Sequence, residues 1–513
     1  MAKKYILTID EGTTSARAIL FNHDGMPVSI AQNEFNQYYP YPGWIEQDPK
    51  EIWATTTEVI NKCKKQAGVD DDDILAVGIT NQRETCVVWD KETGVPVYNA
   101  IVWGDNRQEI VDGYNAMRAD GYEEVLKEKT GLVCDPEFSA LKVKWILDNV
   151  EETRYRAKQG ELYYGNIDCW ILWNLTRGKA HKTDYSNASR TALFNIKTLD
   201  WDQELLDKFD IPREMMPEVC DSMGNFGEVH MGTTFQKPLP ITAILGDQMA
   251  ATFGQACFEE GDCKMTFGTA GVFDSIIGNE PKKSESGLLT SIAWGIDGKI
   301  TYLFEGVVMN SGSTIQYLRD EMRFLEGTSD SEFFAKKAKM PRGTAYFLPM
   351  FSGVGAPYWD ANAKGALFGL TRGIDKNDII LAALDSLGYQ TRDMVDATMR
   401  DTGKPITILK IDGGAAKNDL IAQFNADICG IDVDRPTSVE MTAAGAAFMA
   451  GLAVDFWTSF DDIKKARESE KIFKPEMPEA QKEKLYAGWM NCINTLKVWG
   501  EGTQEIRKKY GDD

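Results

Sequence analysis

The fold is decided by the stretch Tyr5-Ile6-Leu7-Thr8-Ile9-Asp10-Glu11-Gly12-Thr13-Thr14-Ser15-Ala16-Arg17. Its apolar run predicts a buried strand, and Gly12 predicts a tight turn directly after that strand. Backbone N–H groups and the Thr13-Thr14-Ser15 hydroxyls can then donate to phosphate oxygens, and Arg17 adds a planar fork of donors. Asp10 at the strand end is placed to hold Mg²⁺ against those phosphates. The alternative is an ordinary turn, because an acid and a glycine after a strand form many turns.

A motif of the same kind returns far along the chain, as Ile408-Leu409-Lys410-Ile411-Asp412-Gly413-Gly414-Ala415-Ala416, and Asn418 follows where a helix can start. A strand and turn used twice around one nucleotide is how a duplicated α/β fold clamps ATP between its halves. We interpret this second motif as the repeat of the first. The sequence therefore predicts two similar α/β domains, residues 1–254 and 255–513, around a central ATP and substrate cleft.

Length and charge agree with this interpretation. A chain of 513 residues is too long for a single core. The net charge of -22 argues against nucleic acid or an anionic membrane as a partner. ATP must therefore meet local cations, glycines and Mg²⁺. The N-terminal Met-Ala-Lys-Lys and the five-residue, mainly apolar run after it are too short for a signal peptide, so we expect a cytoplasmic protein.

Cysteine and histidine usage restricts the chemistry. The nine cysteines form no Cys-x-x-Cys pair, which argues against zinc and against a disulfide framework. Only three histidines are present, and His23 falls in the predicted hairpin turn Asn22-His23-Asp24-Gly25. Carboxylates must therefore carry any acid-base chemistry.

A polar segment follows the apolar run Ile74–Thr80, as Asn81-Gln82-Arg83-Glu84-Thr85. Arg83 can donate to a polyol hydroxyl and Glu84 can accept from one. The alternative is a pair of exposed surface charges, which are common. The position just beyond an apolar strand favours a site. Trp103 ends another short strand, where it is either a pocket wall or part of the core.

A third strand, residues 241–246, delivers Asp247 and Gln248 into the start of a helix. Asp247 is our candidate general base, and the alternative is a helix cap. The strand Cys263–Phe267 ends in Gly268-Thr269-Ala270-Gly271, another turn suited to phosphate. The small residues of 443–451 predict close packing between the halves, and the chain from Asp461 is predicted to be charged and helical.

With these residues in view, the chain resembles the glycerol kinases of the FGGY carbohydrate kinase family along nearly its whole length. The matching motifs are Asp10-Glu11-Gly12-Thr13-Thr14-Ser15, Gln82-Arg83-Glu84-Thr85, Thr183-Asp184-Tyr185-Ser186-Asn187-Ala188-Ser189-Arg190-Thr191, Gly246-Asp247-Gln248, Phe351-Ser352-Gly353-Val354-Gly355-Ala356-Pro357-Tyr358-Trp359 and Asp412-Gly413-Gly414.

The resemblance implies duplicated ribonuclease-H-like, actin-like ATPase domains that close over ATP, Mg²⁺ and a small polyol. It implies that Arg83, Glu84 and Asp247 hold the polyol and that Asp247 is the base. The nucleotide site it implies is lined by Thr13, Thr269, Gly312, Gln316, Gly414 and Asn418, with Asp10 near the metal. We count Gln248 and Trp103 with the substrate residues, and Thr14, Ser15, Arg17 and Ala415 with the nucleotide residues.

Two positions depart from the family pattern. The residue after Asp135-Pro136 is typically a tyrosine that touches the substrate, and here it is Glu137. An ungapped alignment places Val272 where a phenyl ring usually packs against the substrate carbons, and a shift by one residue would place Phe273 there instead. We expect a more polar and roomier pocket, unless Glu137 turns to solvent or pairs with a cation.

The function that follows is phosphoryl transfer from ATP to a terminal hydroxyl of a small polyol, first of all glycerol, giving glycerol 3-phosphate. One alternative substrate is a four-carbon polyol or another small sugar. An alternative from a different class is an actin-like ATP-driven clamp, which needs no polyol pocket. We expect a homodimer or homotetramer.

Overall fold

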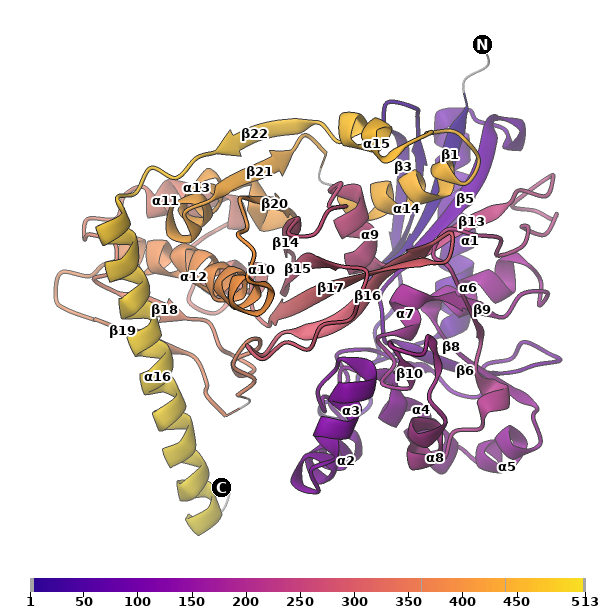
Figure 1. Ribbon diagram of the computed structural model, residues 1–513, viewed down its shortest axis with the longest axis horizontal. Helices are drawn as coiled ribbons and strands as arrows, with labels where there is room; N and C mark the ends of the chain where they lie inside the picture. The colour runs from indigo at the N-terminus through magenta and orange to yellow at the C-terminus, as the bar shows by residue number, and fades with distance from the viewer. Residues whose placement is uncertain (1–3, 361, 439, 511–513) are drawn as a thin grey trace.

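The computed structural model describes residues 4–360, 362–438 and 440–510, and the chain folds around two central sheets (Figure 1). Residues 1–3, on which the expectation of a leaderless N-terminus partly depends, lie outside this description. Among the described residues, no helix is both long and apolar enough for a membrane span.

The first sheet has the strand order β13-β5-β1-β2-β3. Strands β1, β5 and β13 are parallel, and β2 and β3 are antiparallel additions at one side. Their bounds are β1 Tyr5–Glu11, β2 Ser15–Phe21, β3 Pro27–Glu34, β5 Ile74–Asn81 and β13 Ile241–Gly246. Nearly every residue of β1, β5 and β13 is buried, as the apolar runs of the sequence predict for central parallel strands.

The second sheet has seven strands in the order β16-β17-β15-β14-β20-β21-β22. Strand β14 is parallel to β20, which is parallel to β21, whereas β15 and β17 are antiparallel additions. The bounds are β14 Cys263–Phe267, β15 Gly271–Gly278, β16 Leu289–Ile296, β17 Lys299–Val308, β20 Ile408–Asp412, β21 Asp432–Pro436 and β22 Ser469–Phe473.

The two sheets repeat one topology, because β14, β15, β17, β20 and β21 occupy the places of β1, β2, β3, β5 and β13. The predicted duplication is therefore present. Our assignment of the repeat is wrong in detail. The motif that ends at Asp412 belongs to β20, the counterpart of β5, and the counterpart of β1 is β14 with its Gly268-Thr269 turn.

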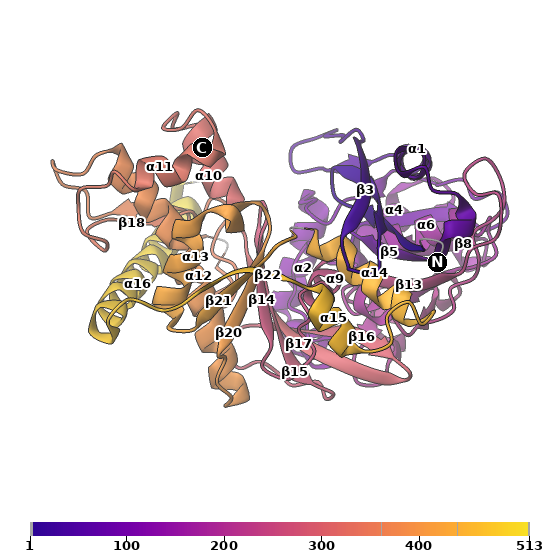
Figure 2. The same ribbon diagram turned by 90° about the horizontal axis from the view of Figure 1, so that it is seen from above.

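Helices pack between and around the sheets. Helix α1 (Pro49–Ala67) packs on β2 and β3, and the long helix α12 (Lys376–Thr402) lies beside α13 (Asp419–Cys429) in the second half. Helix α14 (Met441–Leu452), drawn in orange-yellow, lies among the indigo strands of the first sheet in both views (Figures 1 and 2).

Helices α9 (Asp247–Gly254) and α14 touch backbone to backbone. A Cβ on Gly445 would lie 1.8 Å from the Ala250 carbonyl oxygen, and a Cβ on Gly254 would lie 2.1 Å from that of Met441. The predicted close packing of the small-residue helix is confirmed. Because α14 follows β21, the second half of the chain covers the sheet of the first half.

A long insertion separates β5 from β13. It contains β6 (Cys86–Asp90), β7 (Ala100–Ile101) and β8 (Leu162–Asn166), which form a small sheet with β4 (Glu46–Gln47). Its helices are α2 Gln108–Ala119, α3 Tyr122–Thr130, α4 Ser139–Asn149, α5 Thr153–Lys158, α6 Ile167–Leu175, α7 Tyr185–Ala188 and α8 Gln203–Phe209.

The C-terminal segment is only partly helical. Helix α15 (Phe460–Ala466) and helix α16 (Glu479–Tyr510) are separated by strand β22, which extends the second sheet beyond β21. The prediction of a helical tail therefore missed one strand. Figure 1 shows α16 in yellow, projecting from the body of the molecule toward the C-terminus.

Candidate active site

The predicted substrate residues gather at the carboxyl ends of the parallel strands of the first sheet. Arg83 and Glu84 follow β5, and Asp247 is the first residue of α9, directly after β13. Neighbouring strands β5 and β13 pair up to Asn81 and Gly246, so the two segments leave the sheet side by side. A Cβ on Gly246 would lie 2.7 Å from the Cγ and Cδ atoms of Arg83, so only glycine lets this arginine pack against the strand end.

Arg83 is 5% exposed, and its guanidinium is held by the second half of the chain. Its Nη1 donates to Glu305 Oε2 at 2.6 Å, and Nη2 donates to Glu305 Oε1 at 3.2 Å. Its Nε lies 3.4 Å from Asp247 Oδ1. Glu305 lies within β17 and has no exposed surface. The donors left for a ligand are therefore on the edge of Arg83 that faces Asp247.

Arg190 joins the same cluster from the loop after α7. It has no exposed surface, donates to Glu84 Oε1 at 2.6 Å, and lies 3.0 Å from Glu305 Oε1. Although burial alone would raise the pKa of Glu305, the charges of Arg190 and Arg83 hold that pKa below its ordinary value. Two arginines and two glutamates are thus paired between the halves, as buried charges must be.

Glu84 has a backbone conformation that non-glycine residues rarely adopt, with φ at 58°. Its carbonyl oxygen accepts a hydrogen bond of 2.9 Å from Ser139 Oγ, and its carboxylate is 3% exposed. Unusual backbone of this kind clusters at functional sites, where the surrounding structure holds it in place.

Glu137 pairs with a cation, which is the alternative that the sequence left open. Its Oε1 accepts from Arg190 Nη2 at 3.0 Å, and its side chain is 14% exposed. Burial raises the pKa of Glu137 despite this arginine, and Glu84 adds to the increase. Arg190 links Glu137 to the substrate residues, so Glu137 lies at the margin of the cluster.

The carboxylate of Asp247 is accessible to a ligand and has an elevated pKa. Its side chain is 32% exposed, so a ligand can contact it. Burial raises the pKa of Asp247 to about 6, against the opposing charge of Arg83. It also accepts a hydrogen bond of 2.7 Å from the backbone N–H of Gln248. A carboxylate that is mostly ionised at pH 7 but still basic suits proton abstraction.

Val272 and Phe273 lie on opposite faces of β15, because side chains alternate along a strand. Phe273 has no exposed surface and belongs to the apolar core. Val272 shares its face with Asp274, whose cross-strand partner is Glu305. The structure therefore places Val272, not Phe273, on the face of the charged cluster.

The first turn also carries the predicted phosphate and metal residues. Asp10 is 2% exposed and accepts a hydrogen bond from Arg17, which also donates to Glu440 Oε2 at 2.6 Å. Arg17 is therefore paired with two carboxylates in this arrangement, one from each half, and Asp10 raises its pKa. We predicted that Arg17 faces phosphate, and here it is engaged elsewhere.

Trp103 connects this turn to the substrate residues, since its Nε1 donates to Thr13 Oγ1 at 3.0 Å. The Thr13 carbonyl oxygen accepts from Gln37 and Gln47. Thr14 is exposed, whereas Ser15 is 8% exposed and its hydroxyl accepts from Gln32.

The second half supplies the other predicted nucleotide residues, at the ends of β14 and β20. Thr269 is exposed in the turn after β14, and its neighbour Gly268 accepts a 2.8 Å hydrogen bond from the backbone of Gly312. Gly312 begins α10 (Gly312–Asp320), and Gln316 lies exposed one turn later. A Cβ on Gly312 would lie 2.7 Å from the Gly268 oxygen.

Asn418 caps α13 by accepting from the backbone of Leu420 at 2.9 Å. Gly414 is exposed and Ala415 is half-buried, both in the turn after β20. A hollow of about 270 Å³ opens beside this turn and is lined by Asp412, Gly413, Lys417 and Arg435 among others. The predicted nucleotide residues of the second half therefore lie around two adjacent strand ends.

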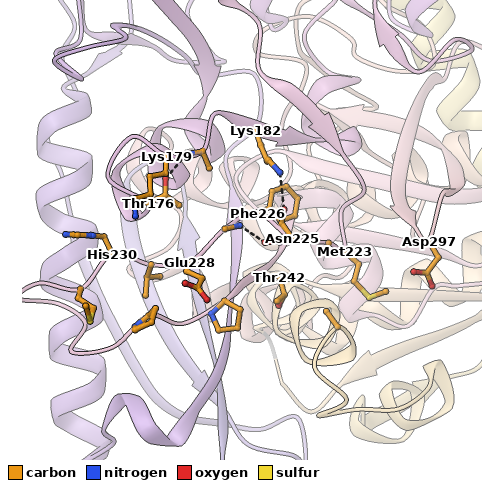
Figure 3. A pocket seen from close by; sticks show the side chains of 18 residues that line it. Thr176, Lys179, Lys182, Met223, Asn225, Phe226, Glu228, His230, Thr242 and Asp297 are labelled. Carbon is orange, nitrogen blue, oxygen red and sulfur yellow. Dashed lines mark hydrogen bonds between the residues drawn. The ribbon is translucent and has the colours of Figure 1, made fainter.

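A larger cavity of about 980 Å³ lies elsewhere (Figure 3). Its lining includes Thr176, Lys182, Met223, His230 and Asp297, and none of the predicted site residues. Choosing the site by cavity size alone would therefore miss the cluster in which the carboxylates Asp247, Glu137 and Glu305 have shifted pKa values.

A magnesium ion at Asp10 would need ligands beyond this protein. Among the described residues, no group of three or more His, Cys, Asp or Glu side chains could hold a metal ion. Mg²⁺ is commonly bound by one or two carboxylates, water and the phosphates of its substrate. The nearly buried carboxylate of Asp10, beside the turn at Gly12, fits that mode.

Sequence reasoning missed three buried charges of the second sheet, Lys264, Asp274 and Glu305. Each interrupts an apolar strand, and each has no exposed surface. A charged residue in the middle of a buried strand is the signal that could have found them. Arg190 lies in the matching motif of residues 183–191, but the sequence alone does not assign it to the charged cluster.

Comparison with known proteins agrees with the motifs. Residues 5–254 match the N-terminal domain of the FGGY family of carbohydrate kinases, and residues 263–454 match its C-terminal domain. Glycerol kinase 2 of Pseudomonas aeruginosa is 49% identical over 98% of each chain. The glycerol kinase of Halothermothrix orenii is 49% identical over 98% of this chain and its own full length.

Solved structures show the same fold. The Plasmodium falciparum glycerol kinase with ADP has a TM-score of 0.89 and 31% identity, covering 96% of this chain and 98% of its own. The xylulose kinase of Lactobacillus acidophilus has a TM-score of 0.86 and 25% identity, over 96% of this chain and 98% of its own. The predicted fold class, two related α/β domains of the ribonuclease-H-like type, is confirmed.

Proposed function

The chain belongs to the FGGY family of carbohydrate kinases, and from that premise we propose that it transfers the terminal phosphoryl group of ATP to a terminal hydroxyl of glycerol. The product is glycerol 3-phosphate. Two findings support glycerol: near half identity to glycerol kinases over almost the whole chain, and a carboxylate with an elevated pKa beside Arg83 and Glu84. The actin-like clamp is not favoured, because it requires no such polyol site.

The single observation that carries the proposal is the pair of Asp247 and Arg83. Asp247 Oδ1 lies 3.4 Å from Arg83 Nε, and its carboxylate is still 32% exposed. In the proposed mechanism Arg83 and Glu84 fix the polyol hydroxyls, and Asp247 accepts the proton of the hydroxyl that attacks. Positioning and charge stabilisation then supply the rate increase, as is usual for phosphoryl transfer.

Nucleotide binding is proposed for the turns after β1, β14 and β20. Thr13, Thr14 and Ser15 would meet the transferred phosphate, while Thr269, Gly312, Gln316, Gly414, Ala415 and Asn418 would surround the rest of ATP. Arg17 would contact phosphate only after leaving Asp10 or Glu440. Mg²⁺, held by Asp10 and the phosphates, would neutralise charge on the phosphate oxygens.

Three further proposals concern the whole molecule. We propose a cytoplasmic location, supported by nine cysteines that are all free. We propose a homodimer or homotetramer, which light scattering would test. We also propose a domain boundary between residues 254 and 255, close to the exposed residues Glu259 and Glu260, where limited proteolysis would test it.

A ligand-dependent thermal shift tests the proposed function directly. A polyol kinase should be stabilised by glycerol, with a free energy that grows with the logarithm of the ratio of glycerol concentration to Kd, and an ATP-driven clamp should not. Xylitol and erythritol are longer polyols for comparison with glycerol, and sucrose is the control for general solute effects on stability. Stabilisation by ATP alone, with no response to any polyol, would contradict the proposal.

A further inference from the structure

Lys264 is a fully buried lysine that has no role in the mechanism proposed above. It lies in β14, between Cys263 and Met265, and has no exposed surface. Burying an ammonium group is costly unless the charge is paired and every N–H is hydrogen-bonded. Its partners should therefore show why the fold tolerates it.

Three side chains and one backbone carbonyl surround the ammonium group, and the carbonyl, that of Val272, is the most distant at 3.4 Å. Lys264 Nζ lies 2.9 Å from Asp274 Oδ2, its cross-strand neighbour on β15. It donates to Gln248 Oε1 at 2.6 Å and to Thr266 Oγ1 at 3.0 Å. Lysine has three protons and no acceptor, so the three shorter contacts, with the side chains, are enough to use all of them.

The contact with Lys264 fixes which end of the Gln248 amide faces inward. The oxygen and nitrogen of an amide are assigned from their hydrogen-bond network, and a donor-only neighbour requires the oxygen. Gln248 must therefore direct Oε1 to Lys264 and its NH₂ group away from it. Among the described residues, that NH₂ group has no hydrogen-bond partner, and Gln248 is partly exposed.

The same ion pair fastens the start of α9. Gln248 follows Asp247, and its backbone N–H donates to Asp247 Oδ1 at 2.7 Å. One turn later, Thr252 Oγ1 lies 2.9 Å from Asp274 Oδ2. Lys264 and Asp274 of the second half thus contact two successive turns of the helix that carries the candidate base.

We propose that Lys264 is a positioning residue that turns the Gln248 amide so that its NH₂ group donates to a substrate hydroxyl oxygen beside Asp247. This inference rests on the proposed function. It gives the polyol site a fixed polarity, because Asp247 and Glu84 accept hydrogen bonds while Gln248 only donates. A substrate that lacks an oxygen at that place leaves a donor unpaired.

A double-mutant cycle tests the coupling between Lys264 and Gln248. Removing Lys264 alone would leave Asp274 buried and unpaired, so the background variant is Lys264→Met with Asp274→Asn. We expect Gln248→Ala to raise KM for glycerol about tenfold in the natural chain and less than twofold in this background, with kcat changed less than KM. Equal costs in both backgrounds would overturn the proposal.

Lys410 provides the matched control. It lies opposite Lys264 on the adjacent parallel strand β20, and its Nζ donates to the Ala256 carbonyl oxygen at 2.8 Å, away from Gln248. In a Lys410→Met background, Gln248→Ala should keep its full tenfold cost. Loss of that cost would mean that any lysine at this place in the sheet matters equally, which contradicts a specific role for Lys264.

A second variant covers the case in which the charge-free background does not fold. Gln248→Glu keeps an oxygen for Lys264 but presents no donor, so it should fold and raise KM for glycerol as much as Gln248→Ala does. A natural KM in this variant would overturn the proposal.

Urea unfolding without substrate separates this inference from the proposed function. The effect of Gln248→Ala on the unfolding midpoint and the effect of the Lys264→Met, Asp274→Asn background should be non-additive if residues 264 and 248 are coupled. Additive effects overturn the role of Lys264 even if glycerol is phosphorylated. Non-additive effects in a protein that turns over no polyol would instead show that the proposed function is wrong, and with it the substrate-facing part of the inference.

Discussion

Glu305 of the second sheet accepts two hydrogen bonds from Arg83 of the first half, 2.6 Å and 3.2 Å long. Arg83 is 5% exposed and Glu305 has no exposed surface. The arginine proposed to bind the polyol is thus oriented by a carboxylate that lies 222 residues further along the chain. The site exists only where the two halves meet.

Removing the carboxylate of Glu305 should therefore destabilise the protein strongly. Glu305→Ala removes the buried carboxylate that Arg83 and Arg190 share, and removing one partner of a buried ion pair typically costs about 3–5 kcal/mol. Urea unfolding followed by circular dichroism measures this loss. The control is Glu128→Gln, which breaks an exposed pair with Lys197 and should leave the midpoint nearly unchanged. Equal effects of the two changes would show that Glu305 is not the anchor.

The rate should depend on the protonation of Asp247. Burial raises its pKa to about 6, and only the ionised carboxylate can accept a proton. We expect kcat/KM for glycerol to fall tenfold for each pH unit below about 6, well above the ordinary range of an aspartate. Circular dichroism at each pH shows whether the fold persists. A rate that stays level down to pH 4.5 in folded enzyme would contradict this assignment.

Asp10 should matter for the nucleotide more than for the polyol. Asp10→Ala removes the carboxylate proposed to hold Mg²⁺ and frees Arg17 from one of its two partners. Turnover should fall at least 100-fold, since a metal contributes several kcal/mol of charge stabilisation, while the thermal shift by glycerol persists. Glu440→Gln is the control, because it removes the other partner of Arg17 and keeps the metal ligand. Activity that persists in excess chelator would rule out the metal's role.

Substrate preference should respond to Glu137 and Val272. Glu137→Tyr replaces an acceptor held by Arg190, and Val272→Phe adds apolar wall on the face of the cluster. Together they should raise kcat/KM for glycerol relative to erythritol, by about 1–3 kcal/mol for a methylene-sized gap that is filled. Phe273→Val, on the opposite face, should reduce stability without moving that ratio. An unchanged ratio in the double variant means that neither position selects the substrate.

The sequence predicted most strand ends of the first half because the signals there are local. The apolar run to Asp10, the run to Thr80 and the run to Gly246 all became buried parallel strands. Helices predicted near residues 50–65 and 378–399 from their amphipathic sequence lie within a few residues of the observed α1 and α12.

Other features could not be predicted, because they depend on distant partners. The motif at Asp412 repeats the local pattern of Asp10, but the equivalence of strands is decided by sheet order, and that makes β14 the true counterpart of β1. Strand β22 is exposed along four of its five residues, so no alternation marks it. Lys264 and Glu305 interrupt apolar strands, and only their partners on other strands and on the first half of the chain explain them.

The central claim is that Asp247 accepts a proton from glycerol as ATP transfers its phosphoryl group. Phosphorus NMR of a reaction with ATP, Mg²⁺ and glycerol, run with the natural chain and with Asp247→Asn, tests it most directly. The account predicts one glycerol 3-phosphate for each ADP, and turnover reduced roughly 10²–10⁴-fold in the folded variant. ADP release without a phosphorylated polyol, or a folded Asp247→Asn variant with near-natural turnover, would contradict it.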